Sequence, residues 1–194
     1  TTTHMFAEAD TLLTDEAEVI IQRLQEDGYA MAGVSEGEKI KALSTETYHR
    51  VCEYADVVLV EADGSKCMPL KYPNAKEPVI PEETDEVIVV CGLNAIGENA
   101  KDVCHRLELV KAHLGIEDDT VITPVHVQKL VTEGYLNPLK KAYPNAKINV
   151  HPRHDGSLYQ RVIASLLHNE QDVSLMRKEW FCPQPKLILC GGGH

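Results

Sequence analysis

The stretch that decides the fold class covers residues 55–81 and reads ADVVLVEADGSKCMPLKYPNAKEPVIP. It begins with an uninterrupted apolar run at residues 57–60, which predicts a buried strand of a parallel sheet. Polar residues follow this run at once, from Glu61 to Lys66. In open parallel sheets, ligands bind beyond the carboxyl ends of the strands. The stretch therefore predicts a buried strand that leads directly into a candidate ligand-binding loop.

Helical and strand patterns alternate on both sides of this stretch. Capping residues and apolar periodicity predict helices over residues 15–27, 45–55, 103–114, 124–134 and 157–167. Short β-branched runs predict further strands over residues 87–90, 121–122 and 147–150. Strands separated by helices imply right-handed crossovers. The expected fold class is therefore α/β, with a mostly parallel sheet flanked by helices.

Two segments rich in proline and polar residues interrupt the alternation. Residues 66–84 form a long connection inside the pattern, and such connections are uncommon without a functional role. Residues 181–186 have the composition of a linker, and an apolar strand pattern follows them in PKLILCGGGH, residues 185–194. The sequence therefore predicts an α/β domain over residues 1–180, followed over 181–194 by a linker and the first strand of a second domain.

Charge and cysteine usage exclude several classes of protein. The 194 residues contain 19 Lys and Arg against 30 Asp and Glu, a net charge of −11. This balance argues against partners that are nucleic acids or anionic membrane surfaces, and no apolar run approaches the roughly 18 residues of a membrane span. The six cysteines lack a zinc-type or disulfide-rich spacing. Reduced thiols, and hence a cytoplasmic protein, are expected.

The polar residues after the 57–60 run suit a phosphate ligand with a divalent cation. Glu61 and Asp63 can hold Mg²⁺ or its water molecules, and Gly64 allows the backbone to approach a ligand. Lys66 or Lys71 can contact phosphate oxygens. A short E-x-D-G pattern by itself more often marks a strand that ends in a polar turn, and it is the length of the polar, proline-bearing continuation that favours a functional role.

Three segments resemble one known family. These are TTTHM at residues 1–5, the 55–81 stretch, and CGLNAIG at residues 91–97 with His105 and Arg106 after it. They resemble the YqeC-type accessory proteins of selenium-dependent molybdenum hydroxylases, which take part in selenium cofactor biosynthesis. The resemblance covers roughly residues 1–145. It implies a fold like that of P-loop NTPases and a nucleotide ligand, ATP or GTP, bound with Mg²⁺.

The resemblance also implies roles for single residues. Asp63 is the first candidate and Glu61 the second for the catalytic acid that organises the metal. The hydroxyl groups of Thr1, Thr2 and Thr3 would face Mg²⁺ or the γ-phosphate. The remaining candidates for phosphate binding are Gly64, Ser65, Lys66, Lys71 and Arg106. The glycine-rich P-loop with G-K-T, which precedes the threonine segment in such proteins, is absent, so we expect a fragment that binds nucleotide poorly.

Two weaker resemblances concern Cys67 and the last residues. The Cys-Met-Pro order after the acidic strand resembles metallochaperone GTPases, which makes Cys67 a candidate thiolate for selenium, sulfur or a soft metal. A partly buried cysteine that acts as a small hydrophobic residue is the alternative. LILCGGGH at residues 187–194 resembles the start of the Rossmann domain of XdhC-type proteins.

The sequence thus predicts a maturation factor for selenium-dependent molybdenum hydroxylases that binds or hydrolyses a nucleotide. Its partners would be the hydroxylase apoenzyme or the machinery that makes its cofactor. Two alternatives stay open: a Mur-type ATP-dependent ligase, suggested by the threonine-rich strand end, and a non-catalytic scaffold that docks the hydroxylase. The nucleotide base is undecided, because no Asn-Lys-x-Asp element follows the strand that ends at Val150.

Overall fold

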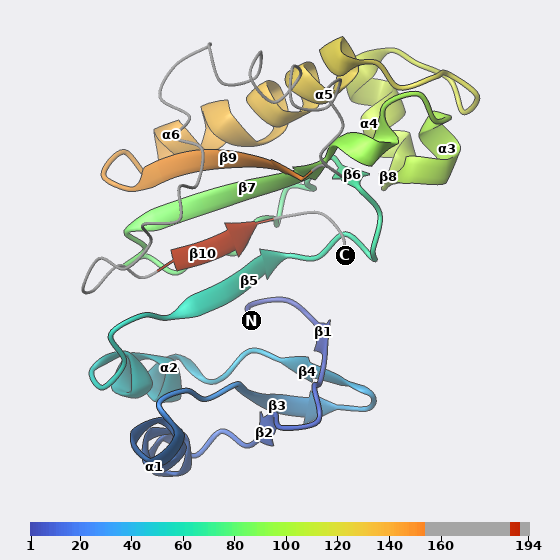
Figure 1. The fold of residues 1–194 in the computed structure, drawn as a ribbon. Helices are drawn as coiled ribbons and strands as arrows, with labels where there is room; N and C mark the ends of the chain where they lie inside the picture. The colour runs from blue at the N-terminus through green and yellow to red at the C-terminus, as the bar shows by residue number, and fades with distance from the viewer. Residues whose placement is uncertain (154–186, 191–194) are drawn as a thin grey trace.

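The computed structural model describes residues 1–153 and 187–190 (Figure 1). The helix predicted over residues 157–167 and the linker predicted over 181–186 lie outside the described residues. The chain is α/β, as the sequence predicts. A small sheet with two helices comes first, and a parallel sheet with helices along it follows.

The first sheet has the strand order β1-β4-β3-β2 and is mostly antiparallel. Its strands are β1 (Met5–Phe6), β2 (Leu12–Leu13), β3 (Ala32–Glu36) and β4 (Lys39–Lys41), and the helices are α1 (Ala17–Asp27) and α2 (Thr45–Cys52). Both predicted helices are confirmed. Gly28 ends α1 in the left-handed conformation, at φ 76°, and the Ser44 hydroxyl accepts the Thr47 N–H at the start of α2. The sequence patterns did not indicate this sheet, because its strands are only two to five residues long.

The second sheet is parallel throughout and has the strand order β5-β10-β7-β9. Its strands are β5 (Leu59–Asp63), β10 (Leu187–Cys190), β7 (Glu86–Gly92) and β9 (Lys147–Arg153). Figure 1 shows all four arrows pointing the same way, with α5 (Pro124–Val131) and α6 (Asn137–Ala142) running along β7 and β9. Ligand-binding residues are therefore expected at the edge where these arrows end.

β10 pairs with β5 on one side and with β7 on the other, so it lies inside the second sheet. The sequence instead suggested that this strand opens a second domain. The predicted boundary at residue 181 falls outside the described residues, so the division into two domains stays a prediction.

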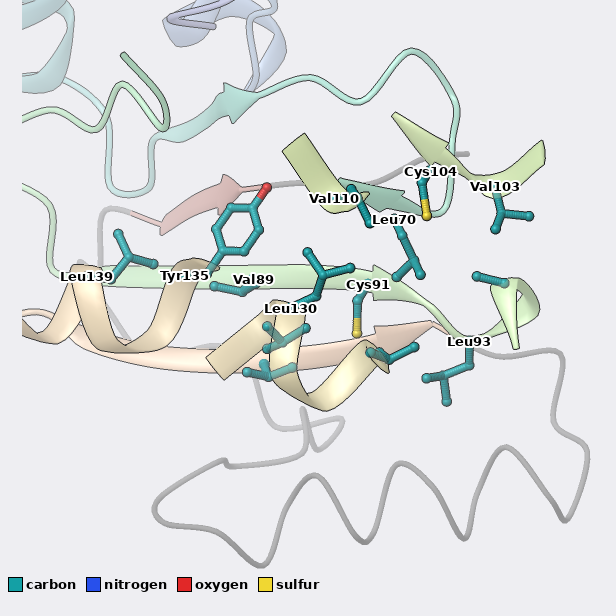
Figure 2. Packing of buried hydrophobic residues seen from close by; sticks show 14 of the residues in the cluster. Leu70, Val89, Cys91, Leu93, Val103, Cys104, Val110, Leu130, Tyr135 and Leu139 are labelled. Carbon is teal, nitrogen blue, oxygen red and sulfur yellow. The ribbon is translucent and has the colours of Figure 1, made fainter. Parts of the chain in front are cut away.

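The main hydrophobic core lies between the parallel sheet and the helices beside it. Val87 and Val89 of β7 are buried against Val127 and Leu130 of α5. Figure 2 shows Leu130, Tyr135 and Leu139 packed along β7, with Leu70 and Cys104 further toward its carboxyl end. Burial of these side chains stabilises the sheet by roughly 1.5–3 kcal/mol for each large apolar residue.

The prediction of a buried strand at residues 57–60 is partly wrong. β5 starts at Leu59 and continues through Glu61 to Asp63, so both acids belong to the strand. Val57 and Leu59 are exposed. β5 lies at the end of the strand order and has only β10 as a strand neighbour within the described chain. An edge strand leaves apolar residues in water, which explains the difference.

The helix predicted over residues 103–114 is correct only for residues 107–114, which follow a short strand. α3 (Ala100–Val103) ends at β8 (Cys104–His105), and α4 (Leu107–Leu114) follows. β8 pairs in parallel with β6 (Leu70–Lys71), and Arg106 has a φ of 58°. A left-handed residue cannot continue a helix. The strand predicted at residues 121–122 is a single bridge between Asn99 and Val121.

The Thr123 cap and Pro124 at the first helical position are confirmed, but Gly134 does not end the helix. α5 continues as a π-helix, Thr132–Leu136, and then as α6. Gly134 is needed for packing: a Cβ atom there would lie 3.1 Å from the Tyr72 ring. π-helical turns within α-helices often occur at functional sites.

Candidate functional site

The candidate residues gather where the strands of the parallel sheet end. The N–H of Gly92, at the end of β7, donates to the carbonyl of Pro69 at 2.9 Å, which holds the segment before β6 against the sheet. β8 lies beside β6. The residues after β5 and the residues around His105 therefore reach the same edge, as Figure 1 shows.

The first group is the threonine–Glu61 cluster, formed by Thr1, Thr2, Thr3, Glu61 and Gly64. The Thr2 N–H donates to the Glu61 carbonyl at 2.9 Å, and the Thr1 hydroxyl donates to the same oxygen at 3.1 Å. The Thr3 hydroxyl lies 3.5 Å from Glu61 Oε2. A Cβ atom on Gly64 would lie 3.7 Å from Glu61 Oε1 and 3.9 Å from the Thr3 hydroxyl. Residues that the sequence separates by about 60 positions therefore share one half-buried surface.

The second group is the buried ion-pair network, formed by Asp63, Lys71, Glu77, Arg106 and Tyr135. The Lys71 ammonium donates to Asp63 Oδ1 and, at 2.8 Å, to the Gly64 carbonyl, and it lies 2.8 Å from Glu77 Oε2. Arg106 Nη2 donates to Glu77 Oε1 at 2.7 Å. The Tyr135 hydroxyl donates to Asp63 Oδ2 at 2.6 Å. The side chains of Lys71 and Asp63 are 1% and 0% exposed.

A bulge explains why two acids of one strand belong to different groups. Glu61 and Asp63 oppose consecutive positions of β10, Leu189 and Cys190, so Ala62 is an extra residue on β5. Such a bulge changes the direction of the side chains that follow it. Ala62 and Asp63 are both buried, and the alternation of buried and half-buried residues stops there.

Burial and neighbouring charges shift the two carboxyl groups of the network in opposite directions. Burial raises the pKa of Asp63, against the lowering effect of the Lys71 and Tyr135 hydrogen bonds. Burial also acts to raise the pKa of Glu77, but the hydrogen bonds from Lys71 and Arg106 outweigh it, and the pKa lies below its ordinary value. Glu77 therefore stays ionised between the two cations.

The two groups differ in their fit to Mg²⁺. Both carboxylate oxygens of Asp63 have partners, and the Lys71 ammonium already supplies the cation beside it. Among the described residues, the one hydrogen bond of the Glu61 carboxylate is a long contact of 3.5 Å with the Thr3 hydroxyl, and its charge also acts on the Thr1 amino group. Mg²⁺ commonly uses one or two carboxylates and completes its octahedron with water and phosphate. Glu61 with the threonine hydroxyls thus fits the ion, and Asp63 in this arrangement does not.

The described residues hold no group of three or more His, Cys, Asp or Glu side chains that could bind a metal by themselves. The cavity lined by Lys71 and Tyr135 measures about 10 Å³, which is room for about one water molecule. A nucleotide does not fit there. Ligand binding is therefore expected on the open side of the site, at Glu61 and the loop after β5.

That loop presents two exposed side chains in an unusual backbone conformation. Lys66 and Cys67 are exposed, with φ of 54° and 61°. Ser65 is buried, and its hydroxyl donates to the Met68 carbonyl at 2.8 Å, so it fastens the turn. Cys67 is a free thiol in contact with solvent, which differs from the alternative of a partly buried hydrophobic residue.

Comparison with known proteins identifies the family. The sequence profile of the family described as "YqeC protein" matches residues 1–108, more than half of the chain. The chain belongs to the YqeC family. A protein of Escherichia coli (strain K12) named "Uncharacterized protein YqeC" is 52% identical over 42 residues, which are 22% of this chain and 16% of that protein. No solved structure matches, so the likeness to P-loop NTPases stays a prediction.

The YqeC match contains every site residue that the sequence suggested, from Thr1 to Arg106. The sequence did not indicate two members of the network. Glu77 belongs to the 55–81 stretch but lies eleven residues beyond Lys66, in a proline-bearing loop, whereas Tyr135 lies outside the family match. In the part of the chain that the structure describes, no helix is long and apolar enough to cross a membrane.

Proposed function

We propose that this YqeC-family chain belongs to a maturation factor for selenium-dependent molybdenum hydroxylases, acting in the cytoplasm on the hydroxylase apoenzyme or its cofactor machinery. The observation that carries the proposal is the family match over residues 1–108, since it spans the threonine–Glu61 cluster and every member of the buried ion-pair network except Tyr135. Free Cys52, Cys67, Cys91 and Cys104 agree with a reducing compartment.

The same proposal includes a nucleotide, ATP or GTP, bound with Mg²⁺ at the carboxyl edge of the parallel sheet. Support comes from the threonine–Glu61 cluster, which offers a carboxylate, hydroxyl groups and a glycine at one surface. Glu61 takes the role of the metal-organising acid. Asp63 has a supporting role in this proposal. It positions the Lys71 ammonium, which donates to the Gly64 carbonyl and so fixes the turn that follows β5.

The maturation role is tested in cells that make a selenium-dependent molybdenum hydroxylase. Deletion of the full-length gene should abolish hydroxylase activity and the incorporation of ⁷⁵Se into that enzyme, while the apoenzyme is still made. Complementation with the wild-type gene should restore both. Normal activity and normal ⁷⁵Se incorporation in the deletion strain would contradict the maturation role.

The nucleotide is tested on the full-length gene product by equilibrium binding and hydrolysis of ATP and GTP with Mg²⁺. Glu61→Gln removes the proposed metal ligand and should weaken binding of the Mg²⁺–nucleotide by about tenfold or more, as expected for a charge-assisted contact. Glu38→Gln, an exposed acid of the first sheet's β3–β4 turn, is the matched control and should bind like the wild type. A full-length protein that binds neither nucleotide would favour a non-catalytic scaffold and contradict this part of the proposal.

A further inference from the structure

Three non-glycine residues of the described chain have a positive φ, and all three lie at this site. They are Lys66 and Cys67, after β5, and Arg106, between β8 and α4. The left-handed conformation is unfavourable for such residues, by roughly 1–3 kcal/mol each, and residues held in it concentrate at ligand-binding sites. Two separate segments of the chain are thus held in strained backbone at one edge of the sheet.

These segments bring cations around His105. Lys71 lies opposite His105 in the pairing of β6 with β8, and Arg106 follows it directly. The pKa of the His105 imidazole is lowered, first by partial burial and then by the charges of Lys71, Arg106 and Lys66, while Glu77 opposes the effect. The chain as a whole carries a net charge of −11, so a cluster of positive side chains is unusual for its overall composition.

The cations differ in what they are already bound to. Lys71 is committed to Asp63, Glu77 and the Gly64 carbonyl. Arg106 uses Nη2 for Glu77, but its Nε is buried and has no hydrogen-bond partner. Buried donors are nearly always bonded, and an orphan often marks a missing ion or water molecule. The side chains of Lys66 and His105 have no hydrogen bond or ion pair within residues 1–153 and 187–190.

We propose that Lys66, His105 and the Nε side of Arg106 form a binding site for a phosphate group or an oxyanion of similar size. Arg106 supplies the planar donor that such anions prefer, held in place by Glu77. Lys66 adds an exposed charge from the solvent side, and His105, which directly precedes Arg106 and pairs with Lys71, adds an imidazole donor. This site adds a phosphate-binding position to the proposed function. It depends on that function only for the source of the phosphate, which is either a nucleotide or a free oxyanion.

The test uses the full-length gene product with inorganic phosphate, and then ATP and GTP, as probes. Binding is followed by calorimetry and by NMR of the backbone amides of Lys66, Cys67 and Arg106, which should shift on addition of phosphate. Lys66→Ala and His105→Ala should each weaken phosphate binding by about fivefold to tenfold. Lys140→Ala, an exposed lysine of α6, is the control and should leave binding unchanged. Circular dichroism confirms that each variant is folded.

The outcomes separate this site from the threonine–Glu61 cluster. If free phosphate binds and competes with the nucleotide, the site takes the phosphate of that nucleotide; if it binds without competition, the ligand is a free oxyanion. Glu61→Gln should leave binding of free phosphate intact even where it abolishes binding of the Mg²⁺–nucleotide. Wild-type affinity for phosphate and nucleotide in both Lys66→Ala and His105→Ala, or no phosphate or nucleotide binding by the wild type, would overturn the assignment.

Discussion

Glu61 and Asp63 are two residues apart on one strand, yet their surroundings are opposite. Glu61 lies in the half-buried threonine–Glu61 cluster, where its carboxylate meets one hydroxyl group. Asp63 lies in the buried ion-pair network, where a cation and a tyrosine hydroxyl occupy both of its oxygens. The extra residue at Ala62 separates them. The comparison shows that two acids near the end of one strand can have different surroundings, one half-buried and one fully buried, and that the local backbone decides which.

The largest expected effect comes from Lys71→Met. The substitution leaves the Asp63 carboxylate buried without its cation, which should lower the free energy of unfolding by about 3–5 kcal/mol. Urea denaturation measures the loss. The double variant Asp63→Leu/Lys71→Met removes the buried charge as well and should recover part of the stability. A loss below about 1 kcal/mol in Lys71→Met would show that the network is not a structural element.

Tyr135→Phe should have the next largest effect. It deletes the hydroxyl that donates to Asp63 and should cost about 1–3 kcal/mol, because the acceptor stays buried. Tyr29→Phe is the matched control, since the Tyr29 hydroxyl donates to Asp10 at the exposed surface. It should change the free energy of unfolding by less than about 0.5 kcal/mol. Equal effects of the two substitutions would contradict the distinction between buried and exposed partners.

A pH series with Glu77→Gln tests the charge of the network. The pKa of Glu77 is lowered from its ordinary value of 4.5, so its ion pairs contribute stability above that pH. The contribution is lost as the pH falls through the lowered pKa in the folded protein. The difference in unfolding free energy between wild type and Glu77→Gln should therefore be present at pH 7 and shrink below pH 4.5. Asp63 is present in both proteins, but the charge of Glu77 contributes to its raised pKa, so the series is repeated in the Asp63→Asn background to isolate Glu77. A difference that does not vary with pH would show that Glu77 acts without its charge.

Glu61→Gln should have the smallest effect on stability, about 0.5 kcal/mol or less, because its carboxylate has a single long contact. Thermal unfolding compared with Glu38→Gln measures this. A loss as large as that of Tyr135→Phe would place Glu61 with the structural residues and weaken its proposed role at Mg²⁺.

Parts of the fold with local causes could be predicted. Ser44 and Thr123 cap helices by bonding the backbone three residues on, and Gly28 ends one, so these boundaries appear in the sequence itself. Gly134 is also a glycine, but it does not end a helix. Its missing side chain leaves room for the Tyr72 ring to pack against a helix that continues. Cys104 and His105 fit a helical pattern, yet pairing with Leu70 and Lys71 makes them a strand. Contacts between distant segments override local preference in both cases.

The candidate site also has features that the sequence determined and features that depend on contacts between distant segments. The sequence by itself determined the α/β class, the family, and which residue types meet at the carboxyl end of β5, because apolar runs, caps and motifs are local patterns. Only the tertiary structure decided that Lys71 is bound to Asp63 and Glu77, that Tyr135 completes the network, and that His105 stands among cations. The physical reason is that burial and hydrogen-bond partners in the site depend on residues up to 72 positions apart. They also depend on one extra residue in β5, after which Asp63 is buried while Glu61 before it is half-buried.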